Sequence, residues 1–150
     1  MAKEIVVIGG GAAGLMAAIT AARQGAAVTL LEPNERLGKK VNITGKGRCN
    51  VTNDCDVDTL IRNVPRNGRF LFSAFHGFTS QDAMAFFEEL GVPLKTERGQ
   101  RVFPVSDRAR DVSGALRDRM HRLGVGVISA RAKEILVEEG RASGVLTAKI

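Results

Sequence analysis

The first 32 residues combine an apolar run, a glycine cluster and a helical segment in an order that few folds use. Glu4 to Ile8 contains the β-branched run IVVI, which predicts a strand buried on both faces of a parallel sheet. The run leads into GGGAAG, Gly9 to Gly14, and then into the alanine-rich segment Leu15 to Gln24, which has high helix propensity. Val28 to Leu31 predicts a second buried strand, which ends at Glu32. This order predicts a βαβ unit with parallel strands.

The glycine cluster has the spacing of a phosphate-binding turn. Gly9 allows a tight turn after the strand, Gly11 removes a side chain where a backbone would approach a pyrophosphate, and Gly14 allows close packing of helix on sheet. Ala12 and Ala13 stand where the N–H groups and the partial positive charge of a helix start favour phosphates. These positions predict a site for an adenine dinucleotide. The alternative is a flexible turn, because the chain holds 17 glycines.

An acid stands at the end of the second predicted strand. Glu32 follows Gly14 by 18 positions, close to the spacing of about 20 at which a carboxylate accepts hydrogen bonds from the adenosine ribose. Pro33 follows directly and is included in the predicted site. A carboxylate here would repel a 2′-phosphate, so NADP is disfavoured at this turn.

The segment after the acid favours FAD over NAD. A nicotinamide-binding domain usually continues from the acid through a short loop into another helix and strand. Here Gly38, Lys39 and Lys40 follow instead, and the chain then enters a second polar loop. Such a loop suits a longer ligand that extends over the edge of the sheet. A solvated basic turn is the alternative for the two lysines.

The second polar loop, NITGKGRCNVTN from Asn42 to Asn53, holds only two large apolar side chains and cannot build a core. Together with GGGAAG and Glu32, the segment Gly38 to Asn53 resembles the bacterial FAD-dependent oxidoreductases that include aminoacetone oxidases and bile-acid enone reductases. TGKGRCNVTN carries the resemblance, because many flavoproteins share the glycine fingerprint. The resemblance extends to VFPVS and to the passage from Leu116 to Ile128.

The resemblance implies that the polar loop lies along the flavin end of FAD. Gly45 would let the backbone pass close to a ring or a phosphate, and Thr44 and Asn50 would offer donors and acceptors. Arg48 could pair with the pyrophosphate or with an acidic partner elsewhere in the fold. Cys49 is expected near the cofactor as well.

The chain has two cysteines, Cys49 and Cys55. Flavin disulfide reductases carry a redox pair with four intervening residues, whereas five residues separate these two and no proline follows the second. We therefore expect a packed thiol at Cys49 rather than a redox-active disulfide. Two cysteines are too few for a disulfide scaffold, which agrees with a reducing compartment and a cytoplasmic location.

Beyond the polar loop, the pattern predicts helices, a hairpin and further strands. The phenylalanines between Asp58 and Gly77, and those of the helix that follows, are expected in the core. Thr79 starts that helix with a capping box and Gly91 ends it. The later elements are a hairpin over 93–104, a helix over 106–123, a buried parallel strand over 125–128, and a meander over 133–150 with turns at 139–141 and 143–144.

Charge and composition exclude several classes of function. Lys and Arg outnumber Asp and Glu by 22 to 16, a net charge of +6, but the cations are scattered among acids, so we expect no nucleic-acid partner. No apolar run reaches the about 20 residues of a membrane span, so we expect no membrane partner. The two histidines lack ligand-spaced acids, which predicts no metal site. Catalytic residues remain unknown.

These expectations combine into an α/β fold, with a Rossmann-like FAD-binding βαβ unit, a parallel sheet, a helical segment and a β-meander. Members of the resembled family are much longer. The resemblance therefore implies that residues 1–150 are the N-terminal part of an FAD/NAD(P)-binding domain, an incomplete one, in which the backbone near Ala132 passes the adenine.

The resemblance also implies an activity. The whole protein would be an FAD-dependent oxidoreductase that transfers a hydride through flavin N5, with a small-molecule substrate and NAD(P)H as candidate reductant. The isolated chain would bind FAD weakly or not at all and would be inactive. The alternative is a nucleotide-binding module that senses NAD or FAD without catalysis.

Overall fold

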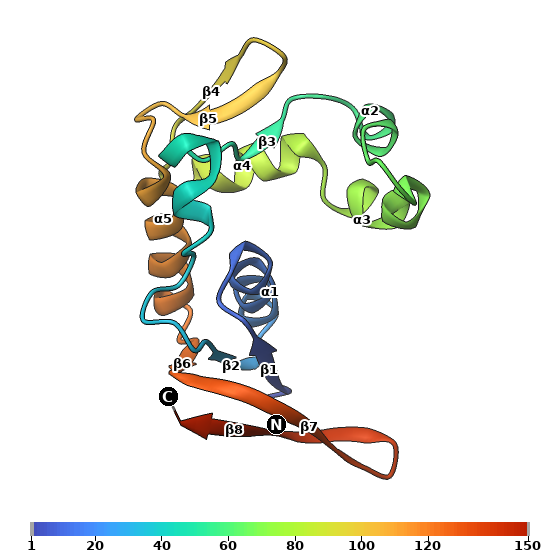
Figure 1. Ribbon diagram of the computed structural model, residues 1–150, viewed down its shortest axis with the longest axis vertical. Helices are drawn as coiled ribbons and strands as arrows, with labels where there is room; N and C mark the ends of the chain where they lie inside the picture. The colour runs from blue at the N-terminus through green and yellow to red at the C-terminus, as the bar shows by residue number, and fades with distance from the viewer. Residues whose placement is uncertain (1, 150) are drawn as a thin grey trace. The chain divides into compact units, whose positions relative to one another are not determined.

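The structure is a computed structural model that describes residues 2–149. The chain forms two compact units, one built from residues 2–41 and 116–149 and the other from residues 42–115. Figure 1 shows the ribbon with the elements labelled.

The first unit is built on a parallel sheet. Its strands are β1 (Glu4–Ile8), β2 (Ala27–Leu31) and β6 (Gly126–Ile128), in the order β1-β2-β6. Helix α1 (Ala12–Arg23) connects β1 to β2 and begins three residues earlier than the sequence pattern predicted. The predicted βαβ unit and the parallel strand that follows it are therefore confirmed.

Only one face of this sheet is well covered. Leu15 and Ile19 of α1 are fully buried, as is Leu30 of β2. On β1, however, the side chains of Val6 and Ile8 are 45% and 51% exposed. The prediction of strands buried on both faces is wrong for β1, where α1 covers one face and the other remains partly open. It is also wrong for β6, where Val127 and Ile128, on opposite faces, are 48% and 50% exposed.

The first unit also contains a hairpin. Strands β7 (Ala130–Glu138) and β8 (Arg141–Lys149) pair antiparallel across the predicted turn at Glu139 and Gly140. The second predicted turn is wrong, because Ser143 and Gly144 lie inside β8. The register shifts there, since Leu136 is opposite Gly144 while Val137 is opposite Ala142. Ser143 is therefore an extra residue of a β-bulge, and the expected meander is one bulged hairpin.

The second unit contains an antiparallel sheet and a capped helix. The strands β3 (Thr52–Asn53), β4 (Leu94–Glu97) and β5 (Arg101–Pro104) lie in the order β3-β5-β4. The β4–β5 hairpin was predicted, whereas β3 was not. Helix α4 (Ser80–Glu89) starts with the predicted capping box, in which Thr79 and Asp82 bond reciprocally.

Three short elements of the second unit lie between β3 and α4, and two of them carry exposed phenylalanines. They are α2 (Val57–Arg62), η2 (Gly68–Leu71) and α3 (Phe72–Gly77), and none of their residues is buried. Phe70 is 86% exposed and Phe72 is 52% exposed, so the prediction that they belong to the core is wrong. The short elements contact one another without enclosing a core. Phe86 and Phe87 of α4 are buried as predicted.

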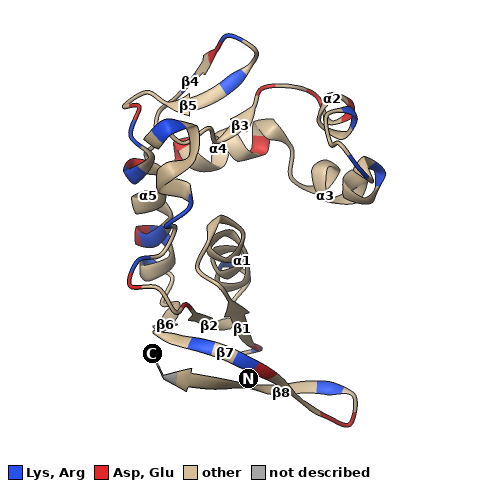
Figure 2. Ribbon diagram, in the orientation of Figure 1, with Lys and Arg blue, Asp and Glu red and all other residues tan. Residues whose placement is uncertain are grey.

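Helix α5 (Ala109–Arg122) begins in the second unit and ends in the first. Val112, Leu116 and Met120 form its buried stripe, as predicted. Its basic side chains alternate with acids, and Figure 2 shows Lys and Arg spread over many elements of the chain. Among residues 2–149, no helix has the length and apolarity to cross a membrane.

Candidate functional site

The glycine turn between β1 and α1 requires glycine at two positions for the fold itself. Gly9 has a φ of +101°, which side chains disfavour, and its N–H donates to the carbonyl of Leu31 at 2.8 Å. At Gly14, a Cβ would collide with the carbonyl oxygen of Gly9 and lie 2.9 Å from its carbonyl carbon. The turn therefore brings β1 and α1 closer than any side chain at Gly14 would permit.

Gly11 differs, because the fold does not require glycine there. Its φ of −78° and ψ of −174° are open to any residue, and a Cβ would meet nothing within 4 Å. Gly11 is the N-cap of α1 and makes no side-chain cap hydrogen bond, and Gly11, Ala12 and Ala13 are all exposed. The start of α1 is therefore open to a ligand, with the polarity that favours an anion.

Glu32 lies beside this turn and braces it. It is only 8% exposed, and its Oε2 accepts a 2.7 Å hydrogen bond from the N–H of Gly10. Its Oε1 accepts from the backbone N–H of Asn34 at 2.7 Å and from Nδ2 of Asn34 at 2.6 Å. An ionised carboxylate offers about four acceptor positions, so roughly one remains for a ribose hydroxyl. The sequence pattern did not identify Gly10 or Asn34 as part of the site.

The hydrogen bonds also set the charge of Glu32. Burial raises the pKa of this carboxyl, but the bonds from the backbone of Asn34, the backbone of Gly10 and the side chain of Asn34 outweigh it. The pKa therefore lies below the ordinary value of 4.5. Glu32 is consequently ionised at neutral pH, next to the open helix start.

Replacement of Glu32 by Gln should remove part of the acid sensitivity of the fold. Because the folded-state pKa is lowered, the carboxylate adds stability that is complete above pH 4.5 and is lost as the pH falls through the lowered value. Urea unfolding across pH 2.5–7 should therefore show that Glu32→Gln lowers stability most at neutral pH and least at the acid end. Glu35→Gln, at an exposed neighbour, is the control for the loss of a negative charge and should change stability by no more than about 0.5 kcal/mol. If Glu32→Gln lowered the stability by the same amount at every pH, that result would contradict the role assigned to the charge.

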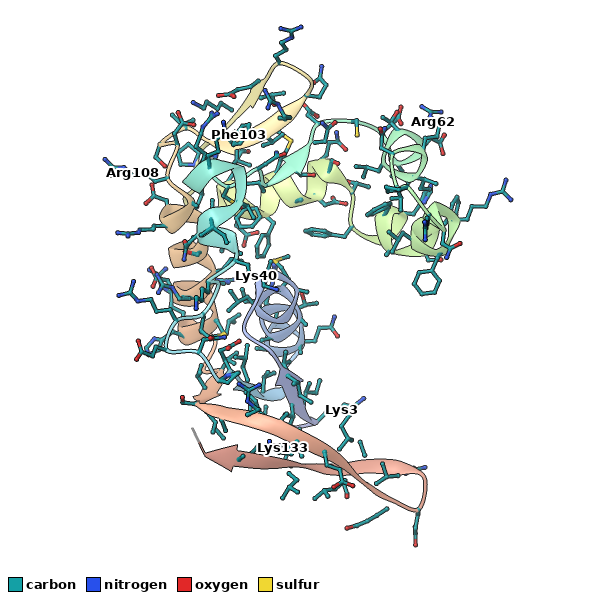
Figure 3. The ribbon with its side chains drawn as sticks, in the orientation of Figure 1. Lys3, Lys40, Arg62, Phe103, Arg108 and Lys133 are labelled. Atoms are coloured by element: carbon teal, nitrogen blue, oxygen red, sulfur yellow. The ribbon has the colours of Figure 1, made fainter. Side chains whose placement is uncertain are left out.

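The segment after Glu32 folds back on the glycine turn. Gly38 is buried with a φ of +69°, and its N–H donates to the carbonyl of Gly10 at 2.7 Å. Pro33 is half-buried beside Glu32, whereas Lys39 and Lys40 are exposed. Lys40 is labelled in Figure 3. In the first unit the predicted positions Gly38 and Glu32 therefore converge on the glycine turn.

The polar loop of the second unit has an irregular backbone. It starts with η1 (Val41–Gly47), in which Gly45 and Lys46 have φ values of 55° and 58°, and Cys49 follows with 62°. A Cβ on Gly45 would lie 3.1 Å from the N of Asn50 and 3.2 Å from Cε1 of Phe103. Glycine at 45 therefore lets the loop pack against itself and against β5.

Arg48 holds this loop to the rest of the second unit. Its Nε donates to Asp107 at 2.7 Å and its Nη2 to Glu97 at 2.5 Å. Its guanidinium carbon also lies 4.1 Å from the ring centroid of Phe103, which Figure 3 labels. Lys95 contacts the same two acids. The sequence left two partners open for Arg48, the pyrophosphate of the cofactor or an acidic side chain. The structure pairs Arg48 with acidic side chains.

The remaining loop residues also make contacts within the second unit. Nδ2 of Asn50 donates to the carbonyls of Thr52 at 2.8 Å and Val102 at 3.0 Å. Thr44 is exposed, and its carbonyl accepts a hydrogen bond from the N–H of Cys49. Burial raises the pKa of the Cys49 thiol, which favours the packed, protonated form.

The predicted site residues thus form two groups. The first group lies at the glycine turn of the first unit and consists of Gly9, Gly11, Glu32 and Gly38. Ala132 also belongs to the first unit, but it lies separately in β7, where it is half-buried and paired with Thr147. The loop residues Thr44, Gly45, Arg48, Cys49 and Asn50 form the other group, in the second unit. Within residues 2–149, no cluster of His, Cys, Asp and Glu could hold a metal ion.

Comparisons of the sequence identify a matching family and several similar proteins. The family described as "HI0933-like protein Rossmann domain" matches residues 3–149. A 3-dehydro-bile acid delta(4,6)-reductase of Clostridium scindens is 38% identical over 89% of this chain and 32% of its own length. A ribosomal RNA dihydrouridine synthase of Haemophilus influenzae is 28% identical over 84% of this chain and 31% of its own length. The chain thus spans about a third of the length of these relatives.

Comparisons of the structure agree on the fold. A 3-ketosteroid-delta4-(5alpha)-dehydrogenase from Rhodococcus jostii matches with a TM-score of 0.75 and 17% identity, covering 98% of this chain and 42% of the other. The THI4 protein of Thermovibrio ammonificans matches with a TM-score of 0.67 and 16% identity, covering 99% of this chain and 47% of the other.

Proposed function

The chain belongs to the HI0933-like family of Rossmann-domain proteins, and we propose on that basis that it is the FAD-binding portion of a flavin-dependent oxidoreductase. The observation that carries the proposal is the open start of α1 beside the buried, ionised Glu32. A helix start attracts a pyrophosphate, and a carboxylate beside it accepts from ribose hydroxyls. The residues present therefore fit the adenosine diphosphate part of FAD.

Each group of residues has its own role in this proposal. Gly9, Gly11, Ala12 and Ala13 would hold the pyrophosphate, and Glu32 would accept from the ribose. The predicted positions Pro33, Gly38, Lys39 and Lys40 would flank this part of the ligand, Ala132 would lie near the adenine, and Thr44, Gly45, Arg48, Cys49 and Asn50 would line the flavin end. Bound FAD would supply hydride transfer at N5 of the flavin. Arg48 would act indirectly, since its guanidinium is engaged by acids that hold the loop in place.

We propose further that the chain is the amino-terminal portion of a longer enzyme. It spans 32% of the bile-acid reductase and 31% of the ribosomal RNA synthase, so the remaining two-thirds would supply the substrate site. The higher identity to the reductase, 38% against 28%, supports a small-molecule substrate over a nucleic acid. NAD(P)H as reductant and a cytoplasmic location also belong to this proposal.

Competition between nucleotides tests the proposed site. The purified chain should bind ADP and FAD weakly and at one shared site. Because Glu32 repels a 2′-phosphate, 2′,5′-ADP should bind at least about tenfold more weakly than AMP, which has the same 5′-phosphate, a difference of about 1.4 kcal/mol. Calorimetric titrations with each ligand, alone and in competition, measure these affinities. Equal affinity for AMP and 2′,5′-ADP, or binding of ADP and FAD without competition, would contradict the proposal.

A second measurement separates an oxidoreductase from a nucleotide sensor. A full-length protein that contains this chain should purify with flavin, and its flavin should be bleached by a reductant and restored by an oxidising substrate. A sensor would bind the nucleotide without turnover of the flavin. Stoichiometric flavin that no electron donor reduces would therefore favour the sensor.

A further inference from the structure

The carboxylate of Glu32 is almost fully occupied by donors of the chain itself. Glu32 is only 8% exposed, and the N–H of Gly10 donates to its Oε2 at 2.7 Å. The backbone N–H and the Nδ2 of Asn34 both donate to Oε1, at 2.7 and 2.6 Å. Since each carboxylate oxygen accepts about two hydrogen bonds, Oε1 has no position left and Oε2 has one.

Close packing at the glycine turn fixes the place of this free position. A Cβ on Gly10 would lie 3.2 Å from both Cβ and Cγ of Glu32 and 2.5 Å from Cδ2 of Leu37, so the side chain of Glu32 lies directly against the backbone of the turn. Rotation of the carboxylate would also break hydrogen bonds to a charged group, which are among the strongest in proteins. Glu32 therefore offers a ligand one acceptor rather than two.

A ribose presents two neighbouring hydroxyls, at the 2′ and 3′ carbons. Each hydroxyl donates a hydrogen bond to water in the free nucleotide, and a bound hydroxyl that finds no acceptor loses that bond without compensation. The single position on Oε2 of Glu32 serves one of the two hydroxyls. The other hydroxyl requires a second acceptor close to Glu32.

The side-chain amide of Asn34 carries such an acceptor. Because an ionised carboxylate only accepts hydrogen bonds, the nitrogen of the amide must face Oε1 of Glu32, and the amide oxygen Oδ1 remains open to a ligand. Asn34 is exposed, and among residues 2–149 its Oδ1 accepts no hydrogen bond. The 2.6 Å bond from Nδ2 thus holds an unengaged acceptor beside the one free position of the carboxylate.

We propose that Asn34 is a second ribose-binding residue, whose Oδ1 accepts from the 3′-hydroxyl while Oε2 of Glu32 accepts from the 2′-hydroxyl. The assignment follows from the general place of the acid in dinucleotide folds, where it bonds to the 2′-hydroxyl. The inference rests on the proposed function, because it requires an adenine nucleotide at the glycine turn. Together, the two side chains select an intact ribose, with both hydroxyls present, over a deoxyribose.

Titrations with nucleotides that lack one hydroxyl test this division. ADP, 2′-deoxy-ADP and 3′-deoxy-ADP are each titrated into the purified chain and followed by calorimetry. 2′-Deoxy-ADP should bind at least about tenfold more weakly than ADP, because it loses a hydrogen bond to a charged acceptor. 3′-Deoxy-ADP should bind about fivefold more weakly than ADP, because it loses a hydrogen bond to a neutral acceptor.

The variant Asn34→Ala identifies the residue behind the smaller loss. It keeps the backbone N–H that donates to Glu32 but lacks Oδ1, so it should bind ADP and 3′-deoxy-ADP equally, to within about twofold. Its preference for ADP over 2′-deoxy-ADP should remain at least about tenfold. Asn63→Ala is the matched control and should retain both losses, since Asn63 is also exposed but donates to the carbonyl of Thr59, in the other unit.

Side-chain NMR of the parent chain gives a readout that does not depend on the folding of a variant. The Nδ2 signals of Asn34 should shift when the chain is saturated with ADP or with 2′-deoxy-ADP, because both ligands keep the 3′-hydroxyl. Saturation with 3′-deoxy-ADP should shift the same signals by a clearly smaller amount. Equal shifts with all three ligands would contradict a contact between Asn34 and the 3′-hydroxyl.

Two results of the titrations would also overturn the inference. They are equal affinity of the parent chain for ADP and 3′-deoxy-ADP, and a preference for ADP over 3′-deoxy-ADP that Asn34→Ala retains in full. In the second case Glu32 alone would serve both hydroxyls. A chain that does not bind ADP at the glycine turn would reject the proposed nucleotide site and this inference together, whereas ADP binding with either of the two results rejects only the role of Asn34.

Discussion

Gly11→Val should abolish most of the nucleotide affinity while leaving the fold intact. Gly11 has an ordinary φ of −78°, and a Cβ there meets no protein atom within 4 Å, so the free chain has room for valine. A ligand at the helix start would occupy that room. Loss of hydrogen bonds to a charged group, worth about 1.5–3 kcal/mol each, should weaken ADP binding by at least about 100-fold.

Calorimetric titration with ADP measures this loss, and urea unfolding shows whether the fold is retained. Gly77→Ala is the matched control, because a Cβ at Gly77 also meets nothing within 4 Å but Gly77 lies in α3, in the other unit. It should leave ADP affinity unchanged. If Gly11→Val bound ADP as well as the parent chain, the absence of a side chain at this position would have no role in binding.

Gly14→Ala, in contrast to Gly11→Val, should destabilise the fold itself. The added Cβ would collide with the carbonyl oxygen of Gly9, a backbone atom that cannot rotate away. Alanine is favoured over glycine inside a helix by about 1 kcal/mol, but overpacking against a backbone should cost more, about 3 kcal/mol. The expected result is therefore a net loss of stability despite the better helix former.

Urea unfolding followed by circular dichroism measures this loss, with Gly77→Ala again as control. A surface substitution of that kind should change stability by no more than about 0.5 kcal/mol. A Gly14→Ala chain as stable as the parent would mean that β1 and α1 can separate at the turn. Together, Gly11 and Gly14 distinguish a glycine that a ligand requires from one that the fold requires.

The parts of the fold that local chemistry determines could be predicted from the sequence. The βαβ unit follows from the run IVVI, the glycines of the turn and the alanine-rich helix, since each requirement involves residues close in the chain. The capping box at Thr79 and the turn of the β4–β5 hairpin at Gly99 are local in the same sense.

Burial was harder to predict, because it depends on what covers a face. IVVI is the composition of a strand buried on both faces, yet Val6 and Ile8 are half-exposed in the described residues. Phe70 has a large apolar side chain of the kind that usually lies in a core, yet it is 86% exposed, because its short segment encloses no core. Ser143 and Gly144 favour a turn, but pairing with β7 places them in a bulge instead.

The individual side-chain partners at the candidate site were not predicted from the sequence. Arg48 reaches Glu97 and Asp107, 49 and 59 residues away, and nothing local to the polar loop indicates either acid. Asn34 lies only two residues from Glu32, and an asparagine after a strand end is a common turn residue. That signal could have identified Asn34 as a brace for the carboxylate.

Backbone NMR of the labelled chain during titration with ADP tests the proposed nucleotide site most directly. We predict saturable shifts at the amides of Gly11, Ala12 and Ala13, at the start of α1, and at Gly10 and Asn34, whose N–H groups bond to Glu32. Shifts confined to other regions, such as the basic and aromatic segment from Arg62 to His76, would contradict a nucleotide site at this turn.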